Sequence, residues 1–267
     1  MGISYDIQGR VAVVGIDRPE VRNAVDPRTA SALYKAFLAI DADDTIDVAI
    51  LTGNGGTFCA GYDLKQAASG PGADWMAEVE IPEDWKDARA DPRPGPMGPS
   101  RLMLSKPVIA AVEGYAVAGG IELAAWCDMR VAAKSAQFGV FCRRWGVPLI
   151  DGGTVRLPRI VGQGRANDLI LTGRPVSAPE AHAMGLADRL CDDGAALSTA
   201  LGLAEQLTRF PQACMRADHL SARMNGAELA AALTREWRSY VTFLKEGQAG
   251  AARFAAGKGR GGDFSDI

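Results

Sequence analysis

Two glycines and then a single carboxylate lie within an otherwise apolar segment, AVAGGIELA, at residues 116 to 124. A second glycine-containing segment, FCAGYDL, lies earlier in the chain at 58 to 64. The first amides of a helix have no intrahelical partner and lie at the positive end of the helix dipole. Glycine lets a ligand approach such amides closely because it has no Cβ. One amide from each segment, converging on a single oxygen, would form an oxyanion hole.

Glu122 follows the glycines directly, in the first turn of the helix that this segment predicts. A carboxylate at that place also stabilises the helix dipole and needs no further role. Tight strand-to-helix packing likewise explains Gly119 and Gly120 without any ligand. The spacing alone therefore leaves two interpretations open, one of packing and one of catalysis.

Two segments that must position these residues share one pattern, a strand followed by a glycine-containing turn and a short helix. A buried strand at 47–53 leads through a glycine-rich turn to the start of a short helix in FCAGYDLKQA. The segment KPVIAAVEGYAVAGGIELAAWCDMRVAA repeats strand, glycine turn, short helix and strand. Before them, two short strands around a Gln8–Gly9 turn predict a hairpin. Asp26 as N-cap and Pro27 at the first helical position predict the helix that follows.

The rest of the chain divides into an irregular excursion and a helical end. Residues 66–100 are rich in proline, glycine and charge, and predict one helix around 75–79. The segment RPVSAPEAHAMGLADRL predicts strand, helix and strand. Helical periodicity then covers 195–210, 212–224 and 227–246, with breaks at Pro211 and Gly226. We therefore divide the chain into a strand-rich core, 1–193, and a helical C-terminal region, 194–267.

Composition excludes several classes of protein. The 267 residues are 48% hydrophobic and 23% charged, as in ordinary globular proteins, and no apolar run reaches the roughly 18 residues of a membrane helix. A net charge of −3 gives no reason to expect nucleic acid as a partner. The five cysteines form no CxxC pair, which argues against a disulfide framework and a zinc site. No export signal is readable at the N-terminus, so we expect a cytoplasmic protein with reduced thiols.

Three segments together resemble the crotonase, or enoyl-CoA hydratase/isomerase, superfamily: FCAGYDL, AVEGYAVAGGIELAAWCDMRVAA and AQFGV. IDRPEVRNAV, PEAHAMGLADRL and the helical tail extend the resemblance over nearly the whole chain. It implies an α/β fold, a spiral of strand-strand-helix repeats with a helical C-terminal trimerisation region. It also implies acyl-CoA substrates, a homo-oligomer that is a trimer or a dimer of trimers, and no cofactor, since coenzyme A is part of the substrate.

The resemblance also implies roles for single residues. The amides of Ala60 and Gly119 would hold the thioester oxygen, and Glu122 would be one of two glutamates that activate water and move a proton. Arg22 and Ala24 would flank the CoA nucleotide. The path of the pantetheine would be lined by Ala60, Asp63 and Leu64, of which Asp63 equally well caps the helix that begins there.

This sequence departs from the family pattern at the second glutamate, where it has Cys142. A thiol with a pKa near 8.5 is a poor substitute for a carboxylic acid, and Arg143 and Arg144, if close, would favour the thiolate. Asp151 in LIDGG is the nearest downstream carboxylate. It is either the replacement acid or base, or a turn or subunit-contact residue.

These features favour an enoyl-CoA hydratase-like lyase that adds water to, or removes it from, an acyl-CoA thioester through a stabilised enolate. The alternatives are an enoyl-CoA isomerase, other enolate chemistry of the family, and a non-catalytic acyl-CoA-binding protein. Glu122 favours an enzyme, because a pure binder needs no carboxylate beside the thioester. A nicotinamide dehydrogenase and a serine hydrolase are set aside, because neither a GxGxxG fingerprint nor a GxSxG elbow is present.

Overall fold

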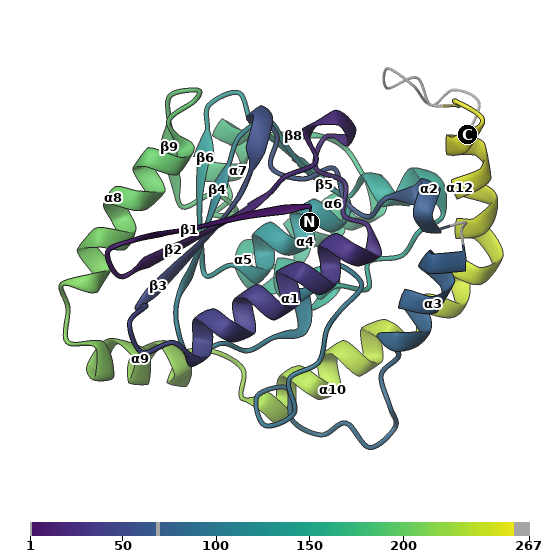
Figure 1. Ribbon diagram of the computed structural model, residues 1–267. Helices are drawn as coiled ribbons and strands as arrows, with labels where there is room; N and C mark the ends of the chain where they lie inside the picture. The colour runs from purple at the N-terminus through teal and green to yellow at the C-terminus, as the bar shows by residue number, and fades with distance from the viewer. Residues whose placement is uncertain (1, 68–69, 259–267) are drawn as a thin grey trace.

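The structure is a computed structural model, and it describes residues 2–67 and 70–258. At its centre, a six-stranded sheet has the order β1-β2-β3-β4-β6-β9, with β1 antiparallel to β2 and the other neighbours parallel (Figure 1). A three-stranded sheet has the order β5-β7-β8. The strands are β1 Ile3–Gln8, β2 Val11–Ile16, β3 Val48–Gly53, β4 Val108–Val112, β5 Tyr115–Val117, β6 Met129–Ala133, β7 Gln137–Gly139, β8 Val176–Ser177 and β9 Arg189–Cys191.

Helices surround these sheets. They are α1 Pro27–Ala42, α2 Leu64–Ala67, α3 Gly70–Glu78, α4 Gly119–Trp126, α5 Gly153–Val161, α6 Gln163–Thr172, α7 Ala178–Ala183, α8 Ala196–Thr208, α9 Gln212–Ser221, α10 Gly226–Trp237, α11 Tyr240–Thr242 and α12 Gln248–Ala255. Short 3-10 turns cover Pro19–Val21, Asn54–Gly56, Pro99–Arg101 and Phe141–Trp145, and a π-helical turn covers Phe243–Gly247.

The parallel strands β2, β3, β4 and β6 are buried on both faces, which explains why they are almost continuously apolar, whereas β1 at the edge is largely exposed. Val11 and Val13 of β2 pack in one cluster with the small residues of α8, whereas Ala12 and Val14 face the main core that includes α1 and α4. The alternation follows from the two-residue period of a strand. Helices therefore cover both faces of these central strands, as in other α/β folds.

The N-terminal predictions are confirmed. β1 and β2 form the expected hairpin, and Gly9 takes the left-handed conformation, φ +61°, that the turn requires. α1 begins at Pro27, and the side chain of Asp26 accepts a hydrogen bond from the amide of Thr29 at 2.8 Å. The cap and the proline thus act as the sequence predicts.

Two predictions about helices are wrong. Gly226 is not a break but the first residue of α10, which Asn225 and Glu228 start with a capping box. The single helix predicted over 227–246 ends at Trp237, whose ring stacks on Tyr240 with centroids 4.8 Å apart. The chain then continues through α11, the π-helical turn and α12. Two further helices, α5 and α6, were not predicted from the sequence, because they lie in a segment with several glycines and with Pro158 inside a helix.

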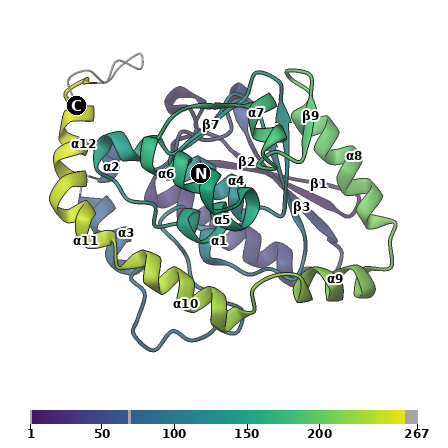
Figure 2. The same cartoon turned by 180° about the vertical axis from the view of Figure 1, so that it is seen from behind.

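The helices after residue 193 pack onto the core. Figures 1 and 2 show α10, α11 and α12 along one edge of the molecule. Leu229, Leu233 and Trp237 of α10 belong to the main core, and α12 packs against α2. Residues 259–267 of the predicted C-terminal region lie outside the described part of the chain.

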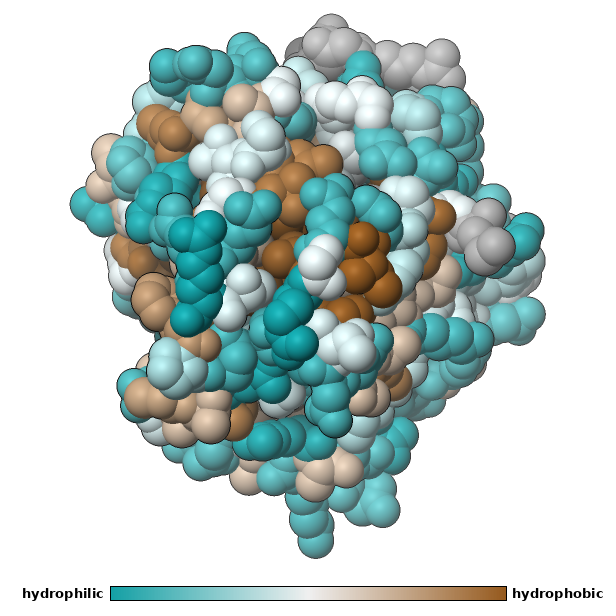
Figure 3. Space-filling model, turned by 60° about the vertical axis from the view of Figure 1, so that its left-hand side comes forward, coloured by the Kyte–Doolittle hydropathy of each residue, from teal (hydrophilic) through white to brown (hydrophobic). Residues whose placement is uncertain are grey.

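The face in Figure 3 is largely hydrophilic, with separate apolar patches near its centre. Among the described residues, no helix is both long enough and apolar enough to span a membrane.

Candidate active site

Glu122 occupies the first turn of α4, and its side chain is 3% exposed. Its Oε1 accepts hydrogen bonds from the backbone amides of Asp151 at 2.8 Å and Gly153 at 2.9 Å. Among the described residues, its other oxygen has no hydrogen-bond partner. The carboxyl group is therefore held by one oxygen at the start of α5, and the second oxygen is left for other chemistry.

The two glycines before Glu122 have different surroundings. A Cβ on Gly120 would lie 2.1 Å from the carbonyl oxygen of Cys59, so this glycine is required for close backbone packing. Gly119 is the first residue of α4, and nothing in the described part of the chain accepts a hydrogen bond from its amide. The Met97 side chain packs against the Cα of Gly119: a Cβ on Gly119 would lie 2.7 Å from the Met97 sulfur.

The segment that contains Ala60 runs beside the one that leads to Gly119. Cys59 donates to the carbonyl of Tyr115 at 2.8 Å, and a Cβ on Gly61 would lie 3.0 Å from the Gly119 nitrogen. The structure thus brings the two predicted amides into one neighbourhood. The Ala60 amide, however, donates to the carbonyl oxygen of Arg22 at 3.0 Å, so of the two amides the Gly119 amide is the one without an acceptor among the described residues.

Asp151 is buried beside Glu122, in the turn before α5. Its Oδ1 accepts the amide of Met97 at 2.9 Å and the hydroxyl of Ser100. Arg156 donates to the carbonyl of Asp151 at 3.0 Å and to that of Ser100 at 2.7 Å. Asp151 therefore joins the irregular 66–100 segment to the turn that holds Glu122.

Cys142 is also buried near this group, in the 3-10 turn after β7. Burial, and then the negative charge of Glu122, raise the pKa of its thiol to about 12. The expectation that Arg143 and Arg144 would favour a thiolate is wrong. The charge of Arg143 acts in that direction but is outweighed, and the arginine side chains donate to the carbonyls of Ile170 and Gly173. The raised pKa favours the neutral thiol of Cys142.

The residues predicted to contact CoA lie close together. Arg22 is exposed, has a left-handed φ of +54° and lies 5.9 Å from the centre of the Tyr115 ring. Ala24 is in the same turn. Asp63 pairs with Arg18 at 3.1 Å and accepts the amide of Lys65, as a cap of α2 does. Leu64 is the first residue of that helix.

Glu236 of α10 is a further buried carboxylate of this site, 6% exposed, that no sequence motif indicated. Its carboxylate accepts the amides of Gly152 at 2.6 Å and Thr154 at 2.8 Å, and the Thr154 hydroxyl at 2.7 Å. A signal was present, because Leu229, Leu233 and Trp237 place Glu236 on the apolar side of a helix. A carboxylate there needs buried partners.

The charges of this cluster are strongly coupled. Burial raises the pKa of Glu122 well above its usual value, and the charges of Asp151 and Glu236 raise it further. Burial also raises the pKa of Asp151 and of Glu236. Arg101, buried over the Trp237 ring at 4.5 Å, has its pKa lowered by burial to about 10. A carboxyl with a raised pKa beside a second one is typical of acid–base sites.

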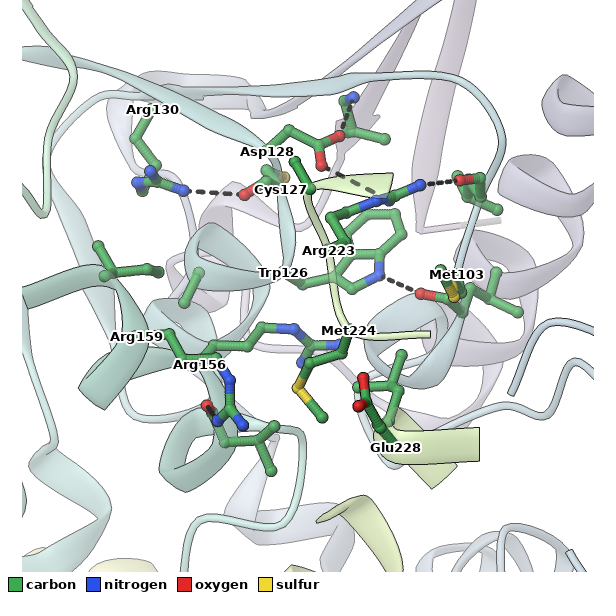
Figure 4. Close-up of a pocket in the computed structure, with 18 of the residues that line it drawn as sticks. Met103, Trp126, Cys127, Asp128, Arg130, Arg156, Arg159, Arg223, Met224 and Glu228 are labelled. Atoms are coloured by element: carbon green, nitrogen blue, oxygen red, sulfur yellow. Dashed lines mark hydrogen bonds and ion pairs between the residues drawn. The ribbon is translucent and has the colours of Figure 1, made fainter. Parts of the chain in front are cut away.

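A cavity of about 610 Å³ lies elsewhere, lined by residues that include Trp126 at the end of α4 and Arg159 of α5 (Figure 4). Its polar lining includes Asp128, Arg159, Arg223 and Arg156, and Trp126 contributes to its apolar wall. None of the residues predicted to be catalytic lines it. Arg156 connects the two places through its bonds to the carbonyls beside the site.

Comparisons with known proteins identify the family. A family model described as enoyl-CoA hydratase/isomerase matches residues 6–258. The chain belongs to this family. It is 40% identical to an enoyl-CoA hydratase of Mycobacterium tuberculosis over 208 residues, and this matched region covers 75% of this chain and 72% of the relative. It is 39% identical over 204 residues to a carnitinyl-CoA dehydratase of Salmonella arizonae, with the same coverage.

Solved structures of the enoyl-CoA hydratase/isomerase family agree with the fold. An enoyl-CoA hydratase from Mycobacterium marinum superimposes with a TM-score of 0.71 and 34% identity, over 96% of each chain. A carnitinyl-CoA hydratase from Mycobacterium avium does so with a TM-score of 0.78 and 29% identity, also over 96% of each chain. The predicted α/β crotonase-like fold with C-terminal helices is thereby confirmed, and the structure shows that its strands form two sheets.

Proposed function

We propose that this chain is an enoyl-CoA hydratase-like lyase in which Gly119, Ala60, Glu122 and Asp151 carry the reaction. The observation that supports it most is the buried Glu122 carboxyl, which lies one helical turn from the Gly119 amide, an amide with no acceptor in the described part of the chain. In this proposal the Gly119 and Ala60 amides hold the thioester oxygen. Negative charge develops on that oxygen when the double-bond electrons move toward it, and preorganised donors there stabilise the transition state.

Glu122 and Asp151 together supply the acid and the base. Two coupled buried carboxyls with raised pKa values favour a state in which one is ionised and the other protonated. The ionised one takes a proton from water as the water oxygen bonds to Cβ. The protonated one gives its proton to Cα as the enolate collapses. The pair returns to one proton in total, so the addition is balanced.

In this proposal, Cys142 lines the site and does not transfer a proton. Its raised pKa and burial support this role, because a neutral thiol with a pKa of about 12 exchanges protons poorly at pH 7. The isomerase alternative differs in needing one carboxyl to shuttle a proton between two carbons. Asp151 would then be dispensable for turnover.

The test follows loss of the conjugated thioester absorbance of short and medium-chain trans-2-enoyl-CoA. We expect Glu122→Gln and Asp151→Asn each to lower kcat by about 10²–10⁴, as for loss of general acid–base catalysis. Cys142→Ala and the exposed-site control Glu228→Gln should retain kcat. Conversion of 3-enoyl-CoA without hydration would indicate the isomerase. Tight acyl-CoA binding without turnover would contradict an enzyme and indicate the binding protein.

We also propose that the helical C-terminal region, 194–267, builds a homo-oligomer, a trimer or a dimer of trimers. Large apolar side chains exposed on this region support the proposal: Phe210, Val241, Leu244 and Phe254. Light scattering on the purified chain measures the mass directly. A monomer at micromolar concentration would contradict the proposal.

A further inference from the structure

Four consecutive backbone amides are shared between two buried carboxylates. The amides of Asp151 and Gly153 donate to Glu122, and those of Gly152 and Thr154 donate to Glu236. Successive N–H groups thus alternate between a residue of α4 and a residue of α10. The turn that starts α5 is held from two sides, and neither carboxylate can shift without moving it.

The place of Glu236 is costly for a carboxylate. It lies on the apolar side of α10, beside Trp237 and one turn after Leu233, and burial raises its pKa. A buried carboxylate persists where hydrogen bonds and nearby positive charge compensate its desolvation. Here two amides, the Thr154 hydroxyl and the charge of Arg156 provide that compensation.

We propose that Glu236 is a positioning residue for the catalytic Glu122, acting through the shared 151–154 turn. The inference rests on the proposed function and adds to it a role for α10. Because Glu122 is held by the amides of Asp151 and Gly153, fixing the intervening amide of Gly152 fixes the direction in which Glu122 points. The same turn carries Asp151, so Glu236 sets the spacing of the two carboxyls.

Glu236 also acts on Glu122 by charge. The titratable and charged groups that face Glu122 are Asp151 before α5, Arg156 on α5, Cys142 after β7 and Glu236 on α10. Negative charge on Glu236 favours protonated Glu122 and so raises the pKa of Glu122. Removing that charge while keeping the shape of the side chain must lower the pKa of Glu122.

The experiment compares Glu236→Gln, Glu236→Asp and the matched control Glu228→Gln from the same helix. Glu228 is exposed, and glutamine also completes a capping box. We measure kcat and KM for trans-2-enoyl-CoA against pH, and titrate the Glu122 carboxyl by infrared spectroscopy, assigned with Glu122→Gln. Glu236→Gln should lower kcat about tenfold or more, change KM less than about threefold, and move the Glu122 titration to lower pH.

Glu236→Asp retains the charge but is too short to hold both amides, so kcat should fall while the Glu122 titration stays in place. Glu228→Gln should change neither. A folded Glu236→Gln protein with the kcat and Glu122 titration of the wild type would overturn the inference. Loss of thermal stability with an unmoved titration would also overturn it, because that is the result of a merely structural role. Absence of turnover in the wild type would instead refute the proposed function. The inference about Glu236 would then be decided only by whether Glu236→Gln moves the infrared titration of Glu122.

Discussion

Glu122 and Glu236 lie on different helices, and their carboxylates accept alternate amides of one four-residue turn. The reactive group is therefore not positioned by its own helix alone. Glu236, 114 positions later in the chain (236 − 122), holds the same turn through the amides of Gly152 and Thr154. This arrangement makes the pH dependence of the cluster a property of several elements together.

The buried Glu122 should make stability depend on pH in a defined window. Its ordinary pKa is 4.5 and its folded pKa is higher, so unfolding releases a proton between these values and stability falls as the pH rises. Below 4.5 the contribution is fully present. Glu122→Gln removes this fall, at about 1.4 kcal/mol per unit of raised pKa, so the variant gains stability relative to wild type above pH 4.5. Urea unfolding from pH 4 to 8 tests this. A difference between the proteins that does not change with pH would contradict it.

The two glycines before Glu122 should respond differently to alanine. Gly120→Ala places a Cβ 2.1 Å from a backbone oxygen, and we expect a loss of about 1–3 kcal/mol in the free energy of unfolding. Gly119→Ala meets only the flexible Met97 side chain, so it should fold with a near-normal Tm and lose activity about tenfold or more. Thermal unfolding and turnover on both variants give the comparison. The opposite pattern would refute the assignment of Gly119 to the hole.

Of the five cysteines, only Cys214 is exposed, so alkylation should select it. At pH 8 a thiol with a pKa of about 12, as for Cys59 and Cys142, is ionised to only about 10⁻⁴. Native protein treated with iodoacetamide should gain one adduct, and urea-unfolded protein five, as counted by mass spectrometry. Rapid labelling of Cys142 in the native protein would contradict its assignment as a neutral residue that lines the site.

Arg130 should be important for stability and not for chemistry. Its buried guanidinium pairs with Asp188 at 2.8 Å and donates to the carbonyls of Leu186 at 2.6 Å and Cys127 at 2.8 Å. Arg130→Met leaves these acceptors without their donor, and we expect about 3–5 kcal/mol of destabilisation. Denaturant titration measures it, with Arg189→Met on the exposed start of β9 as control. Equal stability of the two variants would refute the prediction.

Local signals predicted much of the fold because they act over a few residues. The cap at Asp26, the turn at Gly9 and the apolar strands each depend on near neighbours in the sequence. The prediction of a break at Gly226 is wrong although a local signal was present, since Asn225 and Glu228 form a capping box there; the tertiary structure adds why the position is glycine, because a Cβ would lie 1.9 Å from Asp87. The end of α10 at Trp237 could not be predicted, because neither glycine nor proline follows it in RSY.

The candidate site divides in the same way. Gly119, Glu122 and Asp151 could be named from motifs, and the structure brings them together. Glu236 could not be assigned a role from sequence, because its partners are backbone amides of a distant turn. The protonation of Cys142 could not be predicted either, since it depends on burial and on the charge of Glu122.

The hydrogen bond from Ala60 to the carbonyl of Arg22 changes how the proposed oxyanion hole selects its ligand. A substrate oxygen must displace an acceptor that the protein already supplies. A neutral thioester oxygen competes with an amide carbonyl on nearly equal terms, so the exchange adds little to ground-state affinity. An enolate oxygen forms a charge-assisted hydrogen bond about twice as strong as a neutral one, so it displaces the Arg22 carbonyl from the Ala60 amide. Because of the internal acceptor, the Ala60 amide binds the substrate oxygen strongly only once negative charge has developed on that oxygen. Binding energy that is gained in the transition state and not in the ground state accelerates the chemical step.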